Sequence, residues 1–134
     1  MENVWDRKEL WIKRRKTFAV EVSRHEGLAY DICGKFRWCV YAYLYPDHPL
    51  FSKIEIGKNA DPPICDMPLH GGCTFLDANR NDSGGITSWK IGCDYNHLYD
   101  DHYTHMETKE DALSVFMDAE RLIAYLSEIE PNGE

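Results

Sequence analysis

Residues 36–45 read FRWCVYAYLY, and this stretch decides the fold. It consists mostly of aromatic and β-branched residues, which favour a half-buried strand. Pro46 ends it, because proline has no backbone N–H to donate to a neighbouring strand. We therefore expect a strand over residues 36–45.

Further strands flank this one along the chain. Residues 17–22 alternate between apolar and other side chains with a period of two. Residues 73–76 and 86–91 resemble the two strands of a hairpin, because residues 77–85 between them are almost all turn formers. The pattern predicts a mainly antiparallel sheet.

Two segments show helical periodicity. In residues 4–15, apolar residues recur at seven-residue spacing. Near the C-terminus, Thr108 and Asp111 resemble a capping box. A helical stripe follows it: Ala112, Val115, Phe116, Ala119, Leu122, Ile123, Leu126 and Ile129. We expect an α+β fold, with a mainly antiparallel β-sheet packed against N-terminal and C-terminal helices.

Length and composition indicate one ordinary globular domain over residues 1–134. The chain has 134 residues, 43% hydrophobic and 28% charged. Its net charge of -8 disfavours general nucleic-acid binding, which needs a basic face. It has no apolar run near the roughly 20 residues of a membrane span, and no apolar leader at its start. We expect no membrane partner and a cytoplasmic location.

The charge is unevenly distributed along the chain. The first 40 residues hold nine Lys/Arg and six Asp/Glu, whereas the remainder holds six and seventeen. Residues 13–16 read KRRK, so Arg14 and Arg15 are candidate ligands for the phosphates of a nucleotide. The alternative is a solvated end of the N-terminal helix, where cations are favoured.

The five cysteines include no C-x-x-C pair. We expect free, largely buried thiols rather than disulfides, as is usual for a chain without a secretion signal. These cysteines are Cys33, Cys39, Cys65, Cys73 and Cys93.

Two polar segments, HGGCTF beginning at His70 and WKIGCDYNH ending at His97, form the candidate site. In an antiparallel hairpin the start of one strand lies beside the end of the other, which brings His70 near Gly92 and Asp94. Glycine lets a ligand or another backbone approach closely. The candidate ligand-binding residues here are His70, Gly71, Gly72, Thr74, Trp89, Asp94 and His97.

Several chemistries fit these residues. His70, Asp94 and His97 could ligate a divalent metal, with a further ligand from the nearby residues Asp100, Asp101 or His102. The Asp94-x-x-His97-x-x-Asp100 spacing is not a specific metal signature. Asp94 could instead orient a histidine that acts as a general acid or base. In a purely structural role, Asp94 would bond loop amides and His70 would bond buried backbone.

The remaining chemistry is binding without turnover. Tyr41, Tyr43 and Trp89 could provide stacking surface for a polar ligand. The chain has no G-x-S-x-G, P-loop or Rossmann pattern, so nucleophilic catalysis and ordinary ATP or NAD chemistry are disfavoured. We expect no cofactor, and binding is favoured over enzymatic activity.

The two segments resemble the sequence pattern of a known family. HGGCTF followed by WKIGCDYNH resembles a family of small proteins of bacteriophages, prophages and bacteria with the pattern H-G-G-x-T-F and then W-x-x-G-x-D-x-x-H. The resemblance extends over about residues 20–126. The chain differs from the family in having Cys73 where an aliphatic residue is usual, and Tyr95-Asn96 where a small residue is expected.

Small phage proteins often antagonise host immunity, and this sets the functional expectation. The resemblance implies a protein of the host-cell cytoplasm that sequesters a signalling nucleotide, of a cyclic or ADP-ribose type. One alternative is a metal- or His-dependent hydrolase of such a nucleotide. Another is an acidic protein inhibitor of a host defence nuclease. Assembly into a homo-oligomer stays open.

Overall fold

The computed structural model describes residues 8–26, 36–95 and 101–130. Five strands form one sheet: β1 (Lys8–Arg14), β2 (Phe18–Glu26), β3 (Phe36–Leu44), β4 (Phe75–Arg80) and β5 (Ile86–Asp94). One α-helix, α1 (Leu113–Ile129), follows the sheet. The short 3-10 helices are η1 (Phe51–Lys53), η2 (Ile64–Asp66) and η3 (Asp101–His105).

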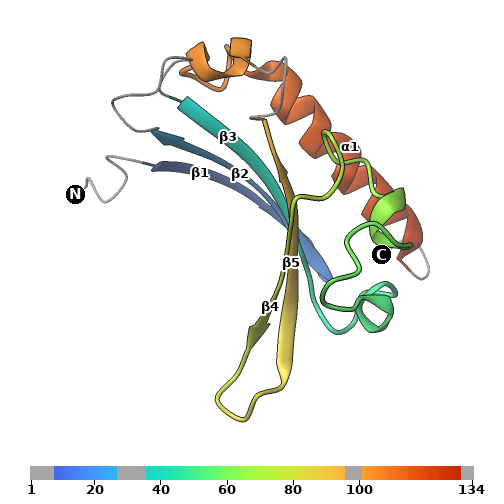
Figure 1. The fold of residues 1–134 in the computed structure, drawn as a ribbon. Coiled ribbons are helices and arrows are strands. Elements are labelled where there is room, and N and C mark those ends of the chain that lie inside the picture. Colours follow the sequence, from blue (N-terminus) through green and yellow to red (C-terminus); the bar gives the residue numbers. More distant parts are fainter. Residues whose placement is uncertain (1–7, 27–35, 96–100, 131–134) are drawn as a thin grey trace.

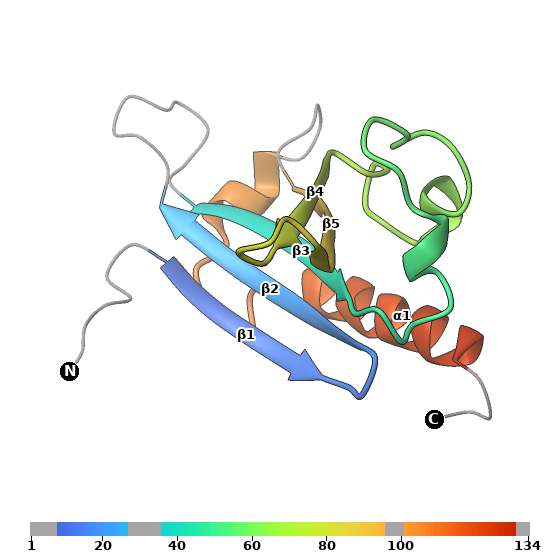
Figure 2. The same ribbon diagram turned by 90° about the horizontal axis from the view of Figure 1, so that it is seen from below.

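The sheet has the strand order β1-β2-β3-β5-β4, and every neighbouring pair is antiparallel. Figure 1 shows a strongly curved sheet with α1 along one face. Figure 2 shows the segment between β3 and β4 on the same side as α1. The α+β expectation is therefore confirmed, and the opposite face, which we call the open face, is covered by none of the described helices.

The strand predicted at residues 36–45 is confirmed as β3, and its side chains explain its central place. Burial alternates without a break along the strand. Trp38, Val40 and Leu44 enter the core on the α1 side, whereas Tyr41 and Tyr43 are half-buried on the open face. Apolar residues of β2 and β5 and the inner stripe of α1 complete the core.

The C-terminal helix is confirmed, but it begins later than its capping pattern suggests. Asp111 accepts hydrogen bonds from the backbone N–H of Thr108 and of Glu107, both at 3.2 Å, and its own N–H donates to the Thr108 hydroxyl at 3.0 Å. These bonds close the turn before Leu113, where α1 starts. No helix among the described residues combines the length and apolar character needed to cross a membrane.

From the hydrogen bonds of Asp111 we expect that the stability difference between wild type and an Asp111→Asn variant depends on pH. Backbone N–H donation from Thr108 and then Glu107 lowers the pKa of Asp111. The stabilisation is therefore present above the unfolded-state pKa of about 3.9 and is lost as the pH falls through the lower folded-state pKa. We expect Asp111→Asn to unfold at a lower temperature than wild type at pH 7, with the gap narrowing towards pH 2–3 in thermal melts. An unchanged gap would show that the charge has no part in closing the turn.

The N-terminal helix expected over residues 4–15 is wrong: residues 8–14 form β1, and residues 1–7 lie outside the described range. Seven-residue spacing cannot exclude a strand in so short a segment. Pairing with β2 satisfies the backbone of β1 along its length, from Lys8 opposite His25 to Arg14 opposite Ala19. In addition, Trp11 stacks on Trp38 of β3, with ring centroids 5.6 Å apart, and this contact favours the strand.

The hairpin is confirmed, but its first strand was placed too early. β4 begins at Phe75 and continues through Arg80, into the first part of the expected connector, and residues 81–85 form the turn. The polar residues of β4 are tolerated because β4 is an edge strand whose side chains are largely exposed.

Candidate functional site

Among the described residues of the predicted hairpin site, Thr74 and Asp94 lie together on the open face. The Thr74 hydroxyl lies 3.4 Å from Oδ2 of Asp94. His70 instead lies towards α1, where its ring stacks on Tyr95 with centroids 4.2 Å apart. The Tyr95 hydroxyl in turn donates to Asp118 of α1 at 2.6 Å. The His70 ring thus lies against Tyr95 and, with centroids 5.6 Å apart, Tyr103, close to α1.

Two glycines explain why His70 leaves the open face. Gly71 and Gly72 have φ values of 70° and 88°, in the left-handed region that favours glycine. The Gly72 N–H donates to the Leu69 carbonyl at 3.0 Å and closes a turn. Because residues 70–74 turn rather than extend, strand alternation does not apply before Phe75.

The other predicted ligand residues are dispersed. Trp89 is 4% exposed in the core, and its indole N–H donates to the Phe51 carbonyl at 3.0 Å. Arg14 is exposed and pairs with Ala19, which places it on the open face, but on the far edge strand. Arg15 lies in the turn between β1 and β2.

The metal hypothesis depends on residues beyond the described ranges, because His97 and Asp100 lie outside them. Within the described ranges, no three His, Cys, Asp or Glu residues are arranged to hold a metal ion. Cys33 also lies outside these ranges. The four described cysteines, Cys39, Cys65, Cys73 and Cys93, are free thiols.

Strand register builds a different constellation on the open face. One row across the sheet runs through Ile12, Glu21, Tyr41, Gly92 and Phe75. The adjacent row runs through Arg14, Ala19, Tyr43, Lys90 and Asp77. These rows bring aromatic rings, cations and carboxyl groups from all five strands onto one surface.

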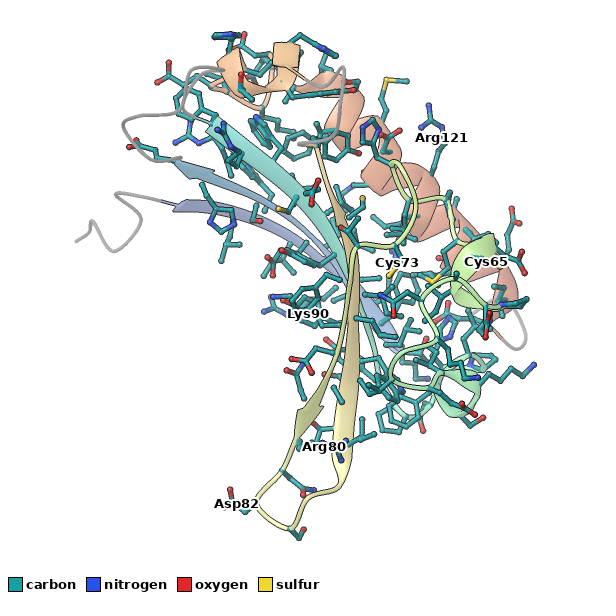
Figure 3. All side chains as sticks on the ribbon, in the orientation of Figure 1. Cys65, Cys73, Arg80, Asp82, Lys90 and Arg121 are labelled. Carbon is teal, nitrogen blue, oxygen red and sulfur yellow. The ribbon has the colours of Figure 1, made fainter. Side chains whose placement is uncertain are left out.

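Lys90 is the centre of this surface. Its ammonium lies 4.2 Å from the ring centroid of Tyr41, 5.4 Å from that of Phe75 and 5.6 Å from that of Tyr43. Cation–π attraction holds it there, and it has no ion pair with any described carboxylate. Figure 3 shows Lys90 on the side of β5 away from Cys65 and Cys73. We call Lys90, Tyr41, Tyr43, Phe75 and Glu21 the Lys90 cluster.

Glu21 adds a buried carboxyl group to the Lys90 cluster. It is 5% exposed, and its Oε1 accepts a hydrogen bond from the Tyr43 hydroxyl at 2.7 Å. Its Oε2 is buried and has no hydrogen-bond partner. A buried polar atom without a partner costs about 1–3 kcal/mol, so a donor supplied by a ligand would relieve that cost.

Burial shapes the protonation of the neighbouring polar groups. Desolvation, followed by the hydrogen bond to Glu21, raises the pKa of Tyr43, and desolvation also raises the pKa of Tyr41. Burial likewise raises the pKa of the Cys39 thiol. At neutral pH these groups are therefore protonated donors, and Cys39 is not an activated nucleophile.

Gly92 is explained by a contact within the protein. A Cβ at this position would lie 2.2 Å from Cδ1 of Tyr41 and 2.6 Å from the Val40 carbonyl oxygen. The Tyr41 ring thus occupies the space that the missing side chain leaves, and the same ring forms a T-shaped contact with Phe75 at 5.5 Å.

Sequence reasoning found Tyr41 and Tyr43 but missed Lys90, Glu21 and Phe75. A signal was available for two of them, because Glu21 is the one charged residue of the predicted strand 17–22 and Lys90 is the one charged residue of the predicted strand 86–91. Such residues mark the outward face of a strand. The register that joins them across β3 depends on long-range pairing, which is not visible in the sequence.

Chemically, the Lys90 cluster offers aromatic surface, one cation and one unsatisfied acceptor. Phe75 is 38% exposed, so a flat ring can reach it. This arrangement of rings, ammonium and carboxyl group suits recognition of a polar aromatic ligand. Comparison of the chain with protein-family models, curated proteins and solved structures finds no match.

Proposed function

We propose that this protein binds a small nucleotide-type ligand on its open face and holds it without turnover. Tyr41, Tyr43 and Phe75 provide stacking surface for the base. Lys90 provides the charge for a phosphate. The observation that carries the proposal is the buried Oε2 atom of Glu21, an acceptor that no described residue supplies with a donor. The same cluster holds the Lys90 ammonium, which pairs with no described carboxylate.

One row of charges on the open face, beside the rows that carry Glu21 and Asp94, supports an anionic ligand. Lys90 and Arg14 belong to the same row of the sheet, and Asp77 ends that row. The row thus holds two cations and one carboxylate, in contrast to the net charge of -8 for the whole chain. An extended ligand with two phosphates would span from one cation to the other, which agrees with a cyclic dinucleotide or an ADP-ribose type.

The resemblance to small phage proteins supplies a biological setting for this proposal. Capture of a signalling nucleotide would deprive host immunity of its messenger, and the protein would act as an antagonist by sequestration. A hydrolase has less support, because the described contacts of His70 are with Tyr95 and Tyr103 near α1, whereas the Lys90 cluster offers rings, an ammonium and a carboxyl group.

Retention and recovery of a nucleotide test the proposal. The full chain is dialysed to equilibrium against ADP-ribose or cyclic diadenylate, then heated to release the ligand for chromatography. We expect retention of at least one of the two nucleotides and its recovery intact. Conversion over many turnovers would favour the hydrolase. Failure of both to bind, together with a stable complex with a host nuclease, would favour the inhibitor.

The Glu21→Gln substitution separates binding from stability. The amide keeps the shape of the side chain but cannot accept a donor as a carboxylate does. We expect the affinity for the retained nucleotide to fall about tenfold, the value of a hydrogen bond to a charged group. The free energy of unfolding should not fall, because burying an amide costs less than burying a carboxylate.

Calorimetric titration and urea unfolding measure the two effects. Glu128→Gln, on the exposed side of α1, is the matched control and should change neither quantity. A loss of more than about 1 kcal/mol of stability with unchanged affinity would show that Glu21 is a structural residue.

A further inference from the structure

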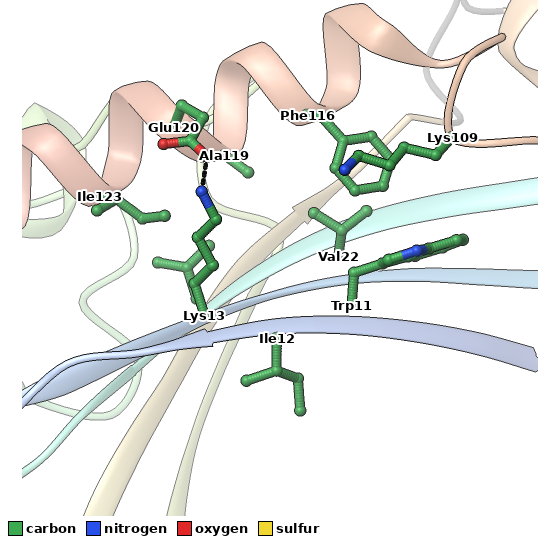
Figure 4. Close-up of a pocket in the computed structure, with 10 residues that line it drawn as sticks. Trp11, Ile12, Lys13, Val22, Lys109, Phe116, Ala119, Glu120 and Ile123 are labelled. Carbon is green, nitrogen blue, oxygen red and sulfur yellow. Dashed lines mark hydrogen bonds and ion pairs between the residues drawn. The ribbon is translucent and has the colours of Figure 1, made fainter.

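A cavity lies on the side of the sheet opposite the open face, between α1 and the edge strand β1. Its volume is about 240 Å³. The apolar lining comes from both elements and from β2: Trp11, Val20, Val22, Phe116, Ala119 and Ile123. In Figure 4, Trp11 and Val22 of the sheet face Phe116 of α1, whereas Ile12 points away.

The aromatic wall of this cavity is held in place by its neighbours. Trp11 stacks on Trp38 at 5.6 Å with an interplanar angle of 19°. Phe116 meets the Trp11 ring edge-on at 5.2 Å and 85°. Trp38 is itself anchored, because its indole N–H donates to the Met106 carbonyl at 2.9 Å. The wall is therefore a preformed apolar surface.

Two lysines border the cavity. The Lys109 ammonium lies 5.3 Å from the Phe116 ring centroid and has no described carboxylate partner. Lys13 reaches across the cavity to Glu120 in an exposed ion pair, drawn as a dashed line in Figure 4. Such surface ion pairs contribute little stability, but this one balances the charge of Glu120. The border carries two cations and one carboxylate.

We propose that this cavity binds a small amphipathic carboxylate, such as an aryl-alkyl carboxylic acid. Its apolar part would lie against Trp11, Val22 and Phe116, and its carboxylate would bind Lys109. Charge complementarity selects an acid, because Lys13 already neutralises Glu120. The size also fits, since a cavity of about 150 Å³ accommodates benzene and this one leaves room for a short chain beyond a ring.

Titration of the full chain with 4-phenylbutyrate tests this site. We expect saturable binding in calorimetry, and at least tenfold weaker binding of 4-phenylbutanol, which keeps the apolar part and lacks the charge. Lys109→Met should weaken 4-phenylbutyrate binding about tenfold, the effect of losing a charge-assisted hydrogen bond. Lys53→Met, an exposed lysine on η1, is the matched control and should bind as wild type does.

A cavity-filling variant shows whether 4-phenylbutyrate binds inside this cavity. Ala119→Leu places three further carbon atoms in the cavity and should abolish binding, with the fold checked by circular dichroism. The proposal is overturned if neither ligand binds, if the alcohol binds as tightly as the acid, or if Lys109→Met binds like Lys53→Met. Undiminished binding to a folded Ala119→Leu variant would also overturn it. Because Lys109 is exposed, its variant decides the question even if Ala119→Leu fails to fold.

Discussion

The K90Q variant is expected to bind its nucleotide about 10- to 100-fold more weakly than wild type, which is the value of a charge-assisted hydrogen bond to a phosphate. Lys90 is half-buried among Tyr41, Tyr43 and Phe75, so its charge is less screened by solvent than that of an exposed lysine. Calorimetric titration with the nucleotide that the protein retains measures the loss.

Stability should change much less than affinity in K90Q. A cation–π contact at a partly exposed site contributes about 0.5–1 kcal/mol, so the unfolding midpoint should move little. K90R preserves the charge and should keep most of the affinity, whereas K53Q removes a distant exposed lysine and should have no effect. Equal affinities of K90Q and K53Q would remove Lys90 from the site.

The G92A variant is expected to lose on the order of 3 kcal/mol of stability, at the upper end of the usual cost of overpacking. Neither contact of the new Cβ can be relieved cheaply. The Val40 carbonyl belongs to the backbone of the central strand, and the Tyr41 ring is confined by Phe75 and Lys90. Urea unfolding followed by fluorescence measures the loss.

Gly85 provides the matched control for G92A. A Cβ there would meet only the Asn81 side chain, at 3.4 Å, which is an ordinary contact. G85A should therefore be neutral or slightly stabilising, because alanine restricts the unfolded chain. If G92A matched G85A in stability and lost only affinity, Gly92 would serve ligand approach rather than packing of Tyr41.

Local patterns in the sequence predict most of the sheet and α1. The buried stripe of α1 and the two faces of β5 follow from periodicity alone, because each strand or helix must bury one face. β1 could not be predicted in this way. Its seven residues are compatible with helix or strand, and its contact with Trp38 of β3 joins residues far apart in the chain.

The candidate site was predicted only in part for a related reason. Strand alternation is enough to put Lys90, Gly92 and Asp94 on one face of β5, where the structure has them, but it does not show which residues of the other strands lie beside them. The same reasoning failed for His70, because the left-handed backbone of Gly71 and Gly72 turns the chain before β4 begins. The pairing of Glu21 with Tyr43 required the register between β2 and β3.

Mapping the bound nucleotide by NMR tests the central claim most directly. The nitrogen-15-labelled full chain is titrated with ADP-ribose and, separately, with cyclic diadenylate, and the backbone amide shifts are followed. The open-face proposal predicts that the largest shifts for at least one nucleotide fall at Tyr41, Tyr43, Phe75 and Lys90. Saturating shifts confined to other parts of the chain, such as α1 and β1, or no shifts with either nucleotide, would contradict it.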